Sequence, residues 1–198
     1  MDMNDQTTIP LFPLQNILFP GGVLTLRIFE PRYLTMISQC MRDGEGFGVC
    51  AIKSGKEVGV AAHCHTIGTY TRIVDFDRDN EGLLTVTLQG EKRFKIIDTE
   101  ILPDQLLTGR VRWLDSVLSM PLPTQYKTLS TLLEQVLRQT RTSLLVEKKD
   151  FQDVRWVVAR LVELLPFAIE DKQRVLEMDS AQERLDVLYG ELLSEVLV

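Results

Sequence analysis

The sequence changes character once, near residue 115, and this change constrains the fold more than any other feature. Before it, short apolar runs rich in β-branched and aromatic residues alternate with turn residues. These runs predict strands at 47–53, 57–62, 66–76, 82–89, 94–99 and 106–114. After it, a proline-rich connector at 120–124 leads into apolar residues at helical spacing. We therefore predict an α+β chain, with a β subdomain over residues 1–118 and an α-helical bundle over residues 119–198.

The β part contains one predicted helix and an unusual beginning. Glu30 and Pro31 open the helix, because proline is tolerated at the first helical position. One apolar face of this helix carries Tyr33, Met36, Ile37, Cys40 and Met41. Residues 9–20 contain three prolines, which argue against a central helix or a central strand there. Short strands at this spacing predict a compact β-barrel or a folded sheet.

The second part is predicted to be helical throughout. A short helix is expected at 171–178, and Ser180 with Glu183 forms a capping box that begins a last helix. Two earlier helices are expected, each from one apolar stripe. The first stripe is Leu129, Leu132, Leu133, Val136 and Leu137. The second is Phe151, Val154, Val158, Leu161 and Leu165.

Composition and charge exclude several classes of protein. Of the 198 residues, 44% are hydrophobic and 25% are charged, which is typical of a globular domain. No apolar run approaches the roughly 20 residues that span a bilayer, and the polar residues 1–8 do not resemble a secretory signal. Three cysteines without a C-x-x-C motif indicate reduced thiols and a cytoplasmic location. The net charge of −6 argues against a basic nucleic-acid module.

The usual catalytic motifs are missing from the sequence. It contains no phosphate-binding loop, G-x-G-x-x-G dinucleotide loop, H-E-x-x-H or G-x-S-x-G pattern that fits its context. His63 and His65 face one side of a strand and could begin a metal site with Cys50, but a polar strand end explains them more simply. We therefore predict no enzyme, no cofactor and no metal; a hydrolase that uses His63 or His65 has the weakest support.

Two charged clusters allow a binding or a structural interpretation. Asp75, Asp77 and Asp79 match the first half of a calcium loop, but the pattern then fails, which favours a solvated hairpin. The dense basic stretch Lys92, Arg93 and Lys95 encloses Phe94 and could contact RNA through charge and stacking. Acidic neighbours and an inward-facing Phe94 argue against that interpretation.

A third cluster lies at the corner between the predicted helix and the β-rich run at 23–29 that precedes it. Arg27, Glu30 and Arg32 could bind a carboxylate or a peptide terminus, because arginine offers a bidentate fork. The simpler alternative is that Glu30 pairs with the arginines and fixes the corner. The apolar segment 11–19 precedes this corner and could form a surface groove, or it could enter the β core instead.

Three segments in order resemble the N-terminal domain of the ATP-dependent Lon protease, and small bacterial proteins made of that domain. They are 9–33 (IPLFPLQNILFPGGVLTLRIFEPRY), 66–97 (TIGTYTRIVDF…GLLTVTLQGEKRFKI) and 164–188 (LLPFAIEDKQRVLEMDSAQERLDVL). The resemblance covers nearly the whole chain. It implies a PUA-like β subdomain followed by a helical bundle, and a role in recognising unfolded or degron-bearing polypeptides. The ATPase and Ser–Lys protease modules of Lon are not expected in this chain.

The leading hypothesis is a non-catalytic polypeptide-recognition or adaptor module. Its expected partners are unfolded or degron-bearing polypeptides and Lon protease itself, with homo-oligomerisation left open and no membrane. RNA binding through the PUA-like subdomain is the alternative. The candidate peptide-binding residues are Arg27, Phe29, Glu30, Arg32, Tyr33, Phe12 and Phe19.

Overall fold

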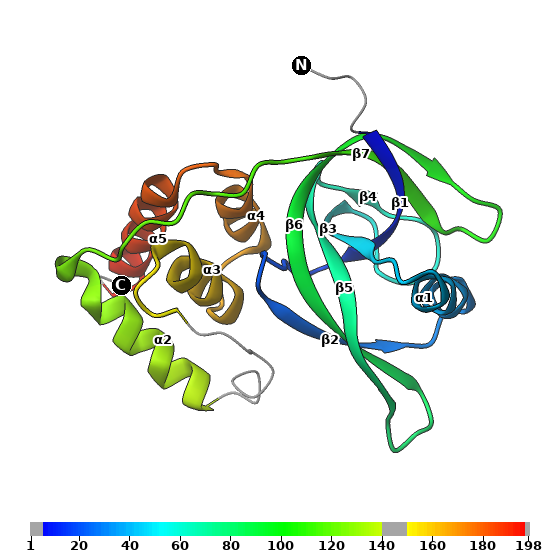
Figure 1. The fold of residues 1–198 in the computed structure, drawn as a ribbon, viewed down its shortest axis with the longest axis horizontal. Helices are drawn as coiled ribbons and strands as arrows, with labels where there is room; N and C mark the ends of the chain where they lie inside the picture. Colours follow the sequence, from blue (N-terminus) through cyan, green and yellow to red (C-terminus); the bar gives the residue numbers. More distant parts are fainter. Residues whose placement is uncertain (1–5, 140–149, 197–198) are drawn as a thin grey trace. The chain divides into compact units, whose positions relative to one another are not determined.

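The computed structural model describes residues 6–139 and 150–196, and it divides into two compact units, Met1–Leu114 and Asp115–Val198. The first unit contains the strands and one helix, and the second contains the other helices (Figure 1). The chain thus has the predicted mixed α and β character. The subdomain boundary expected between residues 118 and 119 stays a prediction.

The first unit is built on one mixed sheet, with seven strands among the described residues, in the order β1-β7-β6-β5-β3-β4. Its strands are β1 (Gln6–Leu14), β2 (Val23–Ile28), β3 (Phe47–Ser54), β4 (His63–Cys64), β5 (Ile67–Arg78), β6 (Leu84–Ile101) and β7 (Leu107–Trp113). β2 pairs with β6 alone, and β1 pairs with β3 as well as with β7. The second pairing of β1 bends the sheet back on itself, so we describe it as a folded sheet.

Residues 9–14 form a strand despite their prolines, but at Pro10 and at Pro13 this strand is paired along one edge only, as the prolines predicted. β1 runs through Pro10 and Pro13, and both prolines have strand partners, Thr108 in β7 and Cys50 in β3. The physical reason is a change of partner at Leu11. Up to Leu11 the strand pairs with β7, and from Leu11 onward it pairs with β3. Each half therefore has only one paired edge, and a strand with an unpaired edge tolerates proline.

Two further strand predictions need correction. Residues 57–62 do not form a strand: 57–60 are bends, 61–62 have no regular structure, and the short β4 follows them. The strands predicted at 82–89 and 94–99 are one continuous strand of 18 residues, β6. Gly90 lies within this strand at a close approach of the chain: a Cβ there would lie 2.4 Å from the carbonyl oxygen of Phe19. The predicted hairpin loop between β5 and β6 is confirmed.

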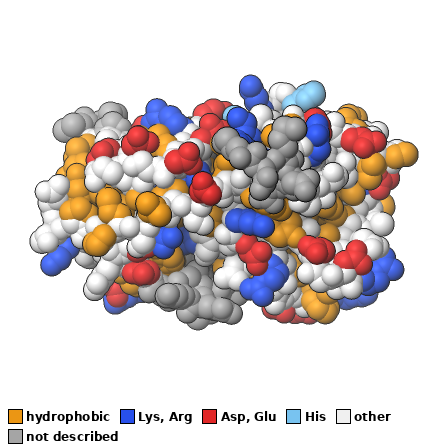
Figure 2. Space-filling model, turned by 45° about the horizontal axis from the view of Figure 1, so that its top comes forward, with side chains coloured by type: hydrophobic (Ala, Val, Ile, Leu, Met, Phe, Trp, Pro, Cys, Tyr) orange, Lys and Arg blue, Asp and Glu red, His pale blue; other side chains and the backbone are white. Residues whose placement is uncertain are grey.

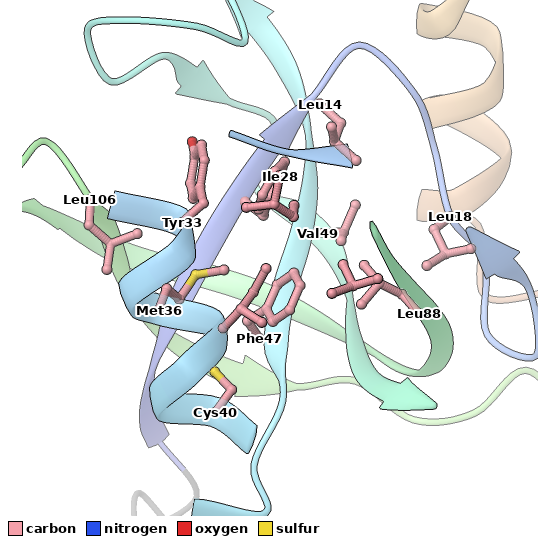
Figure 3. Packing of buried hydrophobic residues seen from close by; sticks show 13 residues of the cluster. Leu14, Leu18, Ile28, Tyr33, Met36, Cys40, Phe47, Val49, Leu88 and Leu106 are labelled. Atoms are coloured by element: carbon pink, nitrogen blue, oxygen red, sulfur yellow. The ribbon is translucent and has the colours of Figure 1, made fainter. Parts of the chain in front are cut away.

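Helix α1 (Pro31–Asp43) lies where the apolar spacing placed it. Pro31 stands at its beginning, and Gly44 ends it with a φ of 70°, a left-handed conformation that glycine adopts without strain. Its buried face meets β3 and the core cluster, where Tyr33, Met36 and Cys40 point toward Phe47 and Ile28 (Figure 3). The helix therefore covers the larger of two clusters in this unit.

A second cluster surrounds Phe94, which is fully buried. Two glycines make room for its ring: a Cβ at Gly48 or at Gly68 would lie 2.6 Å from the ring carbon Cζ. At Gly68 the added atom would also lie 2.5 Å from the backbone oxygen of Val49. The I-G-T stretch of the sequence therefore serves close packing between neighbouring strands.

The second unit contains η1 (Thr124–Tyr126), α2 (Lys127–Gln139), α3 (Val154–Leu164), α4 (Ile169–Glu177) and α5 (Ala181–Val196). Helix α3 is the most buried of these and contacts α2, α4 and α5. The buried Arg184 of α5 donates hydrogen bonds to the carbonyl oxygens of Leu176 and Met178, which satisfies the end of α4. Half of the predicted capping box is present, because the amide of Glu183 donates to Ser180 Oγ at 3.3 Å. No helix among the described residues has the length and apolar character to cross a bilayer.

Asp153 caps α3 and gives the second unit a predicted pH dependence. Its carboxylate accepts from the amide of Arg155 at 2.8 Å and from Ser119 Oγ at 2.9 Å. Burial alone would raise the pKa of Asp153, but the hydrogen bonds from Ser119 and Arg155 outweigh it and the pKa is lowered. The ionised carboxylate therefore stabilises the fold above its unfolded pKa of about 4, and this stabilisation is lost as the pH falls through the lower folded-state pKa.

We expect Asp153→Ala to lower the free energy of unfolding by about 1–2 kcal/mol at pH 7, because the cap and its hydrogen bonds are lost. The difference from the wild type should shrink steadily as the pH falls below about 4. Urea unfolding followed by far-ultraviolet circular dichroism at several pH values measures this. Asp186→Ala, at an exposed position of α5, is the matched control and should change stability by less than about 0.5 kcal/mol. A difference that is constant with pH would contradict the prediction.

Candidate functional site

In the structure the two arginines of the charged corner have different acidic partners. Arg32 is buried; it pairs with Glu30 at 3.0 Å, donates to the carbonyl oxygen of Gln105 at 2.7 Å and lies over the ring of Tyr33. Arg27 instead pairs with Asp79 and Glu81 of the β5–β6 loop, at 2.7 and 2.8 Å. Glu30 thus pairs with Arg32 and fixes the corner, as the simpler interpretation expects, but it does not pair with Arg27, which instead connects β2 to the hairpin.

Most of the apolar candidates lie inside the protein. Phe12, Phe19 and Tyr33 are at most 7% exposed, and all six large apolar side chains of residues 11–19 are buried. Burial raises the pKa of the Tyr33 hydroxyl to about 12, so it stays protonated. The idea of a surface groove formed by residues 11–19 is therefore wrong; this segment belongs to the core. Of the seven candidates, Arg27 and Phe29 are exposed and Glu30 is partly exposed.

A groove does exist in this unit, beside the corner. It has a volume of about 500 Å³ and lies between α1 and the β5–β6 hairpin, which projects from the sheet in Figure 1. Its lining residues are Leu34, Ile37, Ser38, Met41 and Arg42 from α1, and Phe76, Asp77, Arg78 and Leu84 from the hairpin. Leu84 pairs with Ile28, which stands between the exposed Arg27 and Phe29. One end of the α1–hairpin groove therefore borders the exposed part of the predicted site.

A bulge in β5 places Phe76 in the groove. The register with β6 shifts between Ile73 and Asp75, so Val74 is an extra residue. As a result Phe76 pairs with the core residue Val86 and shares the face of Ile73, although residues three apart in a regular strand lie on opposite faces. Beyond the core the same face is open, and Phe76 is 57% exposed. Because of the bulge, the exposed Phe76 lies on the same face of β5 as Ile73, which packs against the core.

The groove combines exposed apolar side chains with two arginine side chains, Arg42 and Arg78. Leu34 and Met41 lie two helical turns apart on α1. Both are about two-fifths exposed, and both line the groove together with Phe76. Arg42 donates to Gln39 and Arg78 has no carboxylate within ion-pair distance, among the residues that the structure describes. Asp77 is the one acidic side chain of the lining. Such a groove fits an extended apolar segment that also carries a carboxylate.

Single exposed apolar residues elsewhere do not make a site. Figure 2 shows hydrophobic side chains at several places on one face, each among charged ones. Scattered exposure of this kind is normal for a folded protein. The α1–hairpin groove differs because three exposed large apolar side chains, Leu34, Met41 and Phe76, line the same hollow.

The remaining clusters have structural explanations. Asp79 accepts from the amides of Glu81 and Leu83 and so closes the hairpin loop, as the solvated-hairpin interpretation expects. Within residues 6–139 and 150–196, no three His, Cys, Asp or Glu side chains come together as metal ligands. In the basic stretch Arg93 and Phe94 are buried, and Lys92 lies over the ring of Trp113 at 3.6 Å. Phe94 is therefore not available for stacking on a base.

Sequence reasoning identified the corner but missed the groove. Ile37 and Met41 line the groove and were both placed on the apolar face of α1, so the sequence gave no sign that this edge of the helix stays open. Phe76 was predicted to end the strand at 66–76, and the aspartates on both sides of it were interpreted as part of a solvated hairpin. Its direction depends on the bulge at Val74, and no residue type marks that bulge in the sequence.

Comparison with known proteins gives one consistent result. Residues 8–194 match the family described as the ATP-dependent protease La (LON) substrate-binding domain. The Lon N-terminal domain protein from Xanthomonas campestris is 34% identical, with a TM-score of 0.76 over 93% of this chain and 98% of that one. The N-terminal domain of Mycobacterium avium complex Lon protease shares the fold, at 17% identity and a TM-score of 0.61 over 92% of this chain and 96% of that one.

Similar full-length proteins include Lon proteases. That of Parabacteroides distasonis is 28% identical over 187 residues, which is 89% of this chain and 22% of the protease. That of Haemophilus influenzae is 24% identical over 206 residues, 98% of this chain and 25% of the protease. The chain thus spans about a quarter or less of the length of these relatives.

Proposed function

Because the chain belongs to the family of the LON substrate-binding domain, we propose that it binds exposed apolar segments of unfolded polypeptides in the α1–hairpin groove. The observation that carries this proposal is the groove itself, in which Leu34, Met41 and Phe76 remain exposed in the folded protein. The membership supports substrate recognition in proteolysis, and the protein is a binding module and not a catalyst.

The physical argument rests on what an unfolded chain offers. Folded proteins bury their large apolar side chains, and unfolded ones present them in extended segments. Covering a groove of apolar side chains with such a segment removes apolar surface from water on both sides, at about 25 cal/mol per Å². The groove therefore distinguishes unfolded from folded polypeptides without reading a particular sequence.

The arginines refine the expected ligand. Arg42 and Arg78 place two guanidinium groups at the groove, and Asp77 offsets one of them. A carboxylate beside an apolar residue can accept a bidentate hydrogen bond from such a group. We expect apolar segments with an acidic neighbour, including degrons of that composition, to bind more tightly than apolar segments with a basic one. In this role the protein would deliver cytoplasmic substrates to a Lon protease.

The direct test is a binding titration with one protein in two states. A fluorescently labelled protein that has been reduced and carboxymethylated stays unfolded, and its native form is the matched control. Fluorescence anisotropy should rise on addition of the chain for the unfolded form and not for the native form. Equal binding of both forms, or of neither, would refute the proposal.

RNA binding through a PUA-like surface has less support. Phe94 is buried, and the half-exposed Tyr70 and Trp113 are already in contact with each other and with Lys92. The same titration with a structured RNA at low salt distinguishes the two functions, because RNA binding would weaken steeply with added salt.

A further inference from the structure

Two of the three cysteines meet in the first unit although 14 residues separate them. Cys64 in β4 pairs with Ile52 in β3, and Cys50 lies two residues before Ile52 on the same face of that strand. Cys50 and Cys64 are thus diagonal neighbours, and their sulfur atoms are 2.9 Å apart. Both are free thiols in this structure.

The surroundings of the two sulfurs differ. Cys50 is 1% exposed and belongs to the cluster around Phe94, whereas Cys64 only partly packs against that cluster and reaches the surface. The third cysteine, Cys40, lies in α1, where its thiol contacts the carbonyl oxygen of Gly46 at 3.6 Å. Cys64 is therefore accessible to a small oxidant, whereas Cys50 is buried next to it.

We propose that Cys50 and Cys64 form a redox-sensitive thiol pair that a small hydroperoxide converts to an intramolecular disulfide. A disulfide bond is about 2 Å long, so the two sulfurs need to approach by only about 1 Å. Strands β3 and β4 already hold the two backbones side by side, so the bond forms with a local adjustment. The proposal is independent of polypeptide binding.

The chemistry balances with hydrogen peroxide as the oxidant. The sulfur of Cys64 attacks one peroxide oxygen, the O–O bond breaks, and Cys64 becomes a sulfenic acid while one water leaves. The sulfur of Cys50 then attacks the sulfur of Cys64. The S–S bond forms, the S–O bond breaks, and the hydroxide leaves with the Cys50 proton as a second water. Two thiols lose two electrons in total, and one peroxide gains them.

The order of the two steps follows from the environment of each thiol. The Cys50 thiol donates its hydrogen bond to the sulfur of Cys64, and this contact together with burial raises the pKa of Cys50 well above its usual value. Cys50 therefore keeps its proton and acts second. Burial also raises the pKa of Cys40, to about 11, which makes it an unreactive internal reference.

The cross-link would affect the loop at residues 55–62, which connects β3 to β4. In this loop the amide of Gly59 donates to Glu30 at 3.3 Å, and Glu57 accepts from the amide of Gln15 at 2.5 Å. A disulfide between Cys50 and Cys64 closes this segment at its base. Oxidation is thus expected to hold the loop against the corner that borders the groove.

Peptide mapping tests the proposal with the wild-type chain. Trypsin separates the three cysteines, because Cys40 falls in peptide 33–42, Cys50 in 43–53 and Cys64 in 57–72. The chain is treated with hydrogen peroxide, alkylated with iodoacetamide in denaturant, digested and analysed by mass spectrometry. We expect peptides 43–53 and 57–72 to appear joined, lighter by two hydrogen atoms than their sum, with Cys40 alkylated. Reduction with dithiothreitol before alkylation should return three alkylated peptides.

Three variants complete the test. Cys64→Ser changes a partly exposed residue and should leave both remaining cysteines alkylatable after oxidation, whereas Cys40→Ser should still give the joined peptides. Cys50→Ala removes the buried cysteine of the pair and should likewise prevent the joined peptides. The proposal is overturned if peroxide leaves all three thiols free, if it joins separate chains, or if Cys64 proceeds to a sulfinic acid without a disulfide.

Discussion

Replacing Phe94 with alanine is expected to lower the free energy of unfolding of the first unit by about 3–5 kcal/mol. The side chain is fully buried, and its ring lies against Gly48 and Gly68. Glycines have no side chains that could move into the space left by the ring. The cavity therefore cannot collapse easily, and the loss should lie near the upper end of that range.

Phe76→Ala is the matched control for this prediction. It removes the same atoms from a residue that is 57% exposed in the same unit, so stability should change by less than about 0.5 kcal/mol. Denaturant unfolding followed by tryptophan fluorescence measures both, since Trp113 packs against the cluster of Phe94. Similar losses for the two variants would mean that Phe94 does not occupy the core as described.

The second large effect concerns binding. Replacing both Met41 and Phe76 with serine should weaken binding of the unfolded polypeptide by about tenfold or more. Each apolar side chain that the ligand covers contributes up to about 1.5–3 kcal/mol, and 1.4 kcal/mol corresponds to a factor of ten. Both side chains are exposed in the free protein, so the fold should be unaffected. The anisotropy titration described above gives the two affinities.

Two further variants distinguish the groove from its neighbours. Ile97 and Ile101 are also large, apolar and about half exposed in the first unit, but they do not line the groove. Replacing both with serine should leave the affinity unchanged. Phe29→Ser examines the corner, which remains a prediction from the sequence. A loss that occurs with Phe29→Ser and not with the groove variant would move the binding site to the corner.

The parts of this fold that could be predicted from the sequence are those determined by residues close together in the chain. The helix that begins at Pro31 was predicted because its apolar spacing and its terminal residues are all contained in one short segment. The hairpin at Asp79 was predicted for the same reason, since its turn residues stand together. The pairing of Glu30 with Arg32 also involves neighbours in the chain.

The parts that could not be predicted depend on contacts between distant residues. Pro10 and Pro13 are tolerated in β1 only because the strand changes partner at Leu11, and those partners lie in β7 and β3. The direction of Phe76 depends on how β5 and β6 align, and the contact of Cys50 with Cys64 depends on the register of β3 and β4. The groove and the thiol pair therefore become visible only in three dimensions.

The double pairing of β1 also has a consequence for biosynthesis. Gln6 is aligned with Arg112, so during synthesis the first half of β1 has no partner until nearly the whole of this unit has been made. Such long-range pairing slows folding, and an unpaired apolar strand invites association with other nascent chains. Pro10 and Pro13 interrupt the row of amide donors that such association needs. The two prolines that look out of place in the finished sheet thus protect the chain while it is being synthesised.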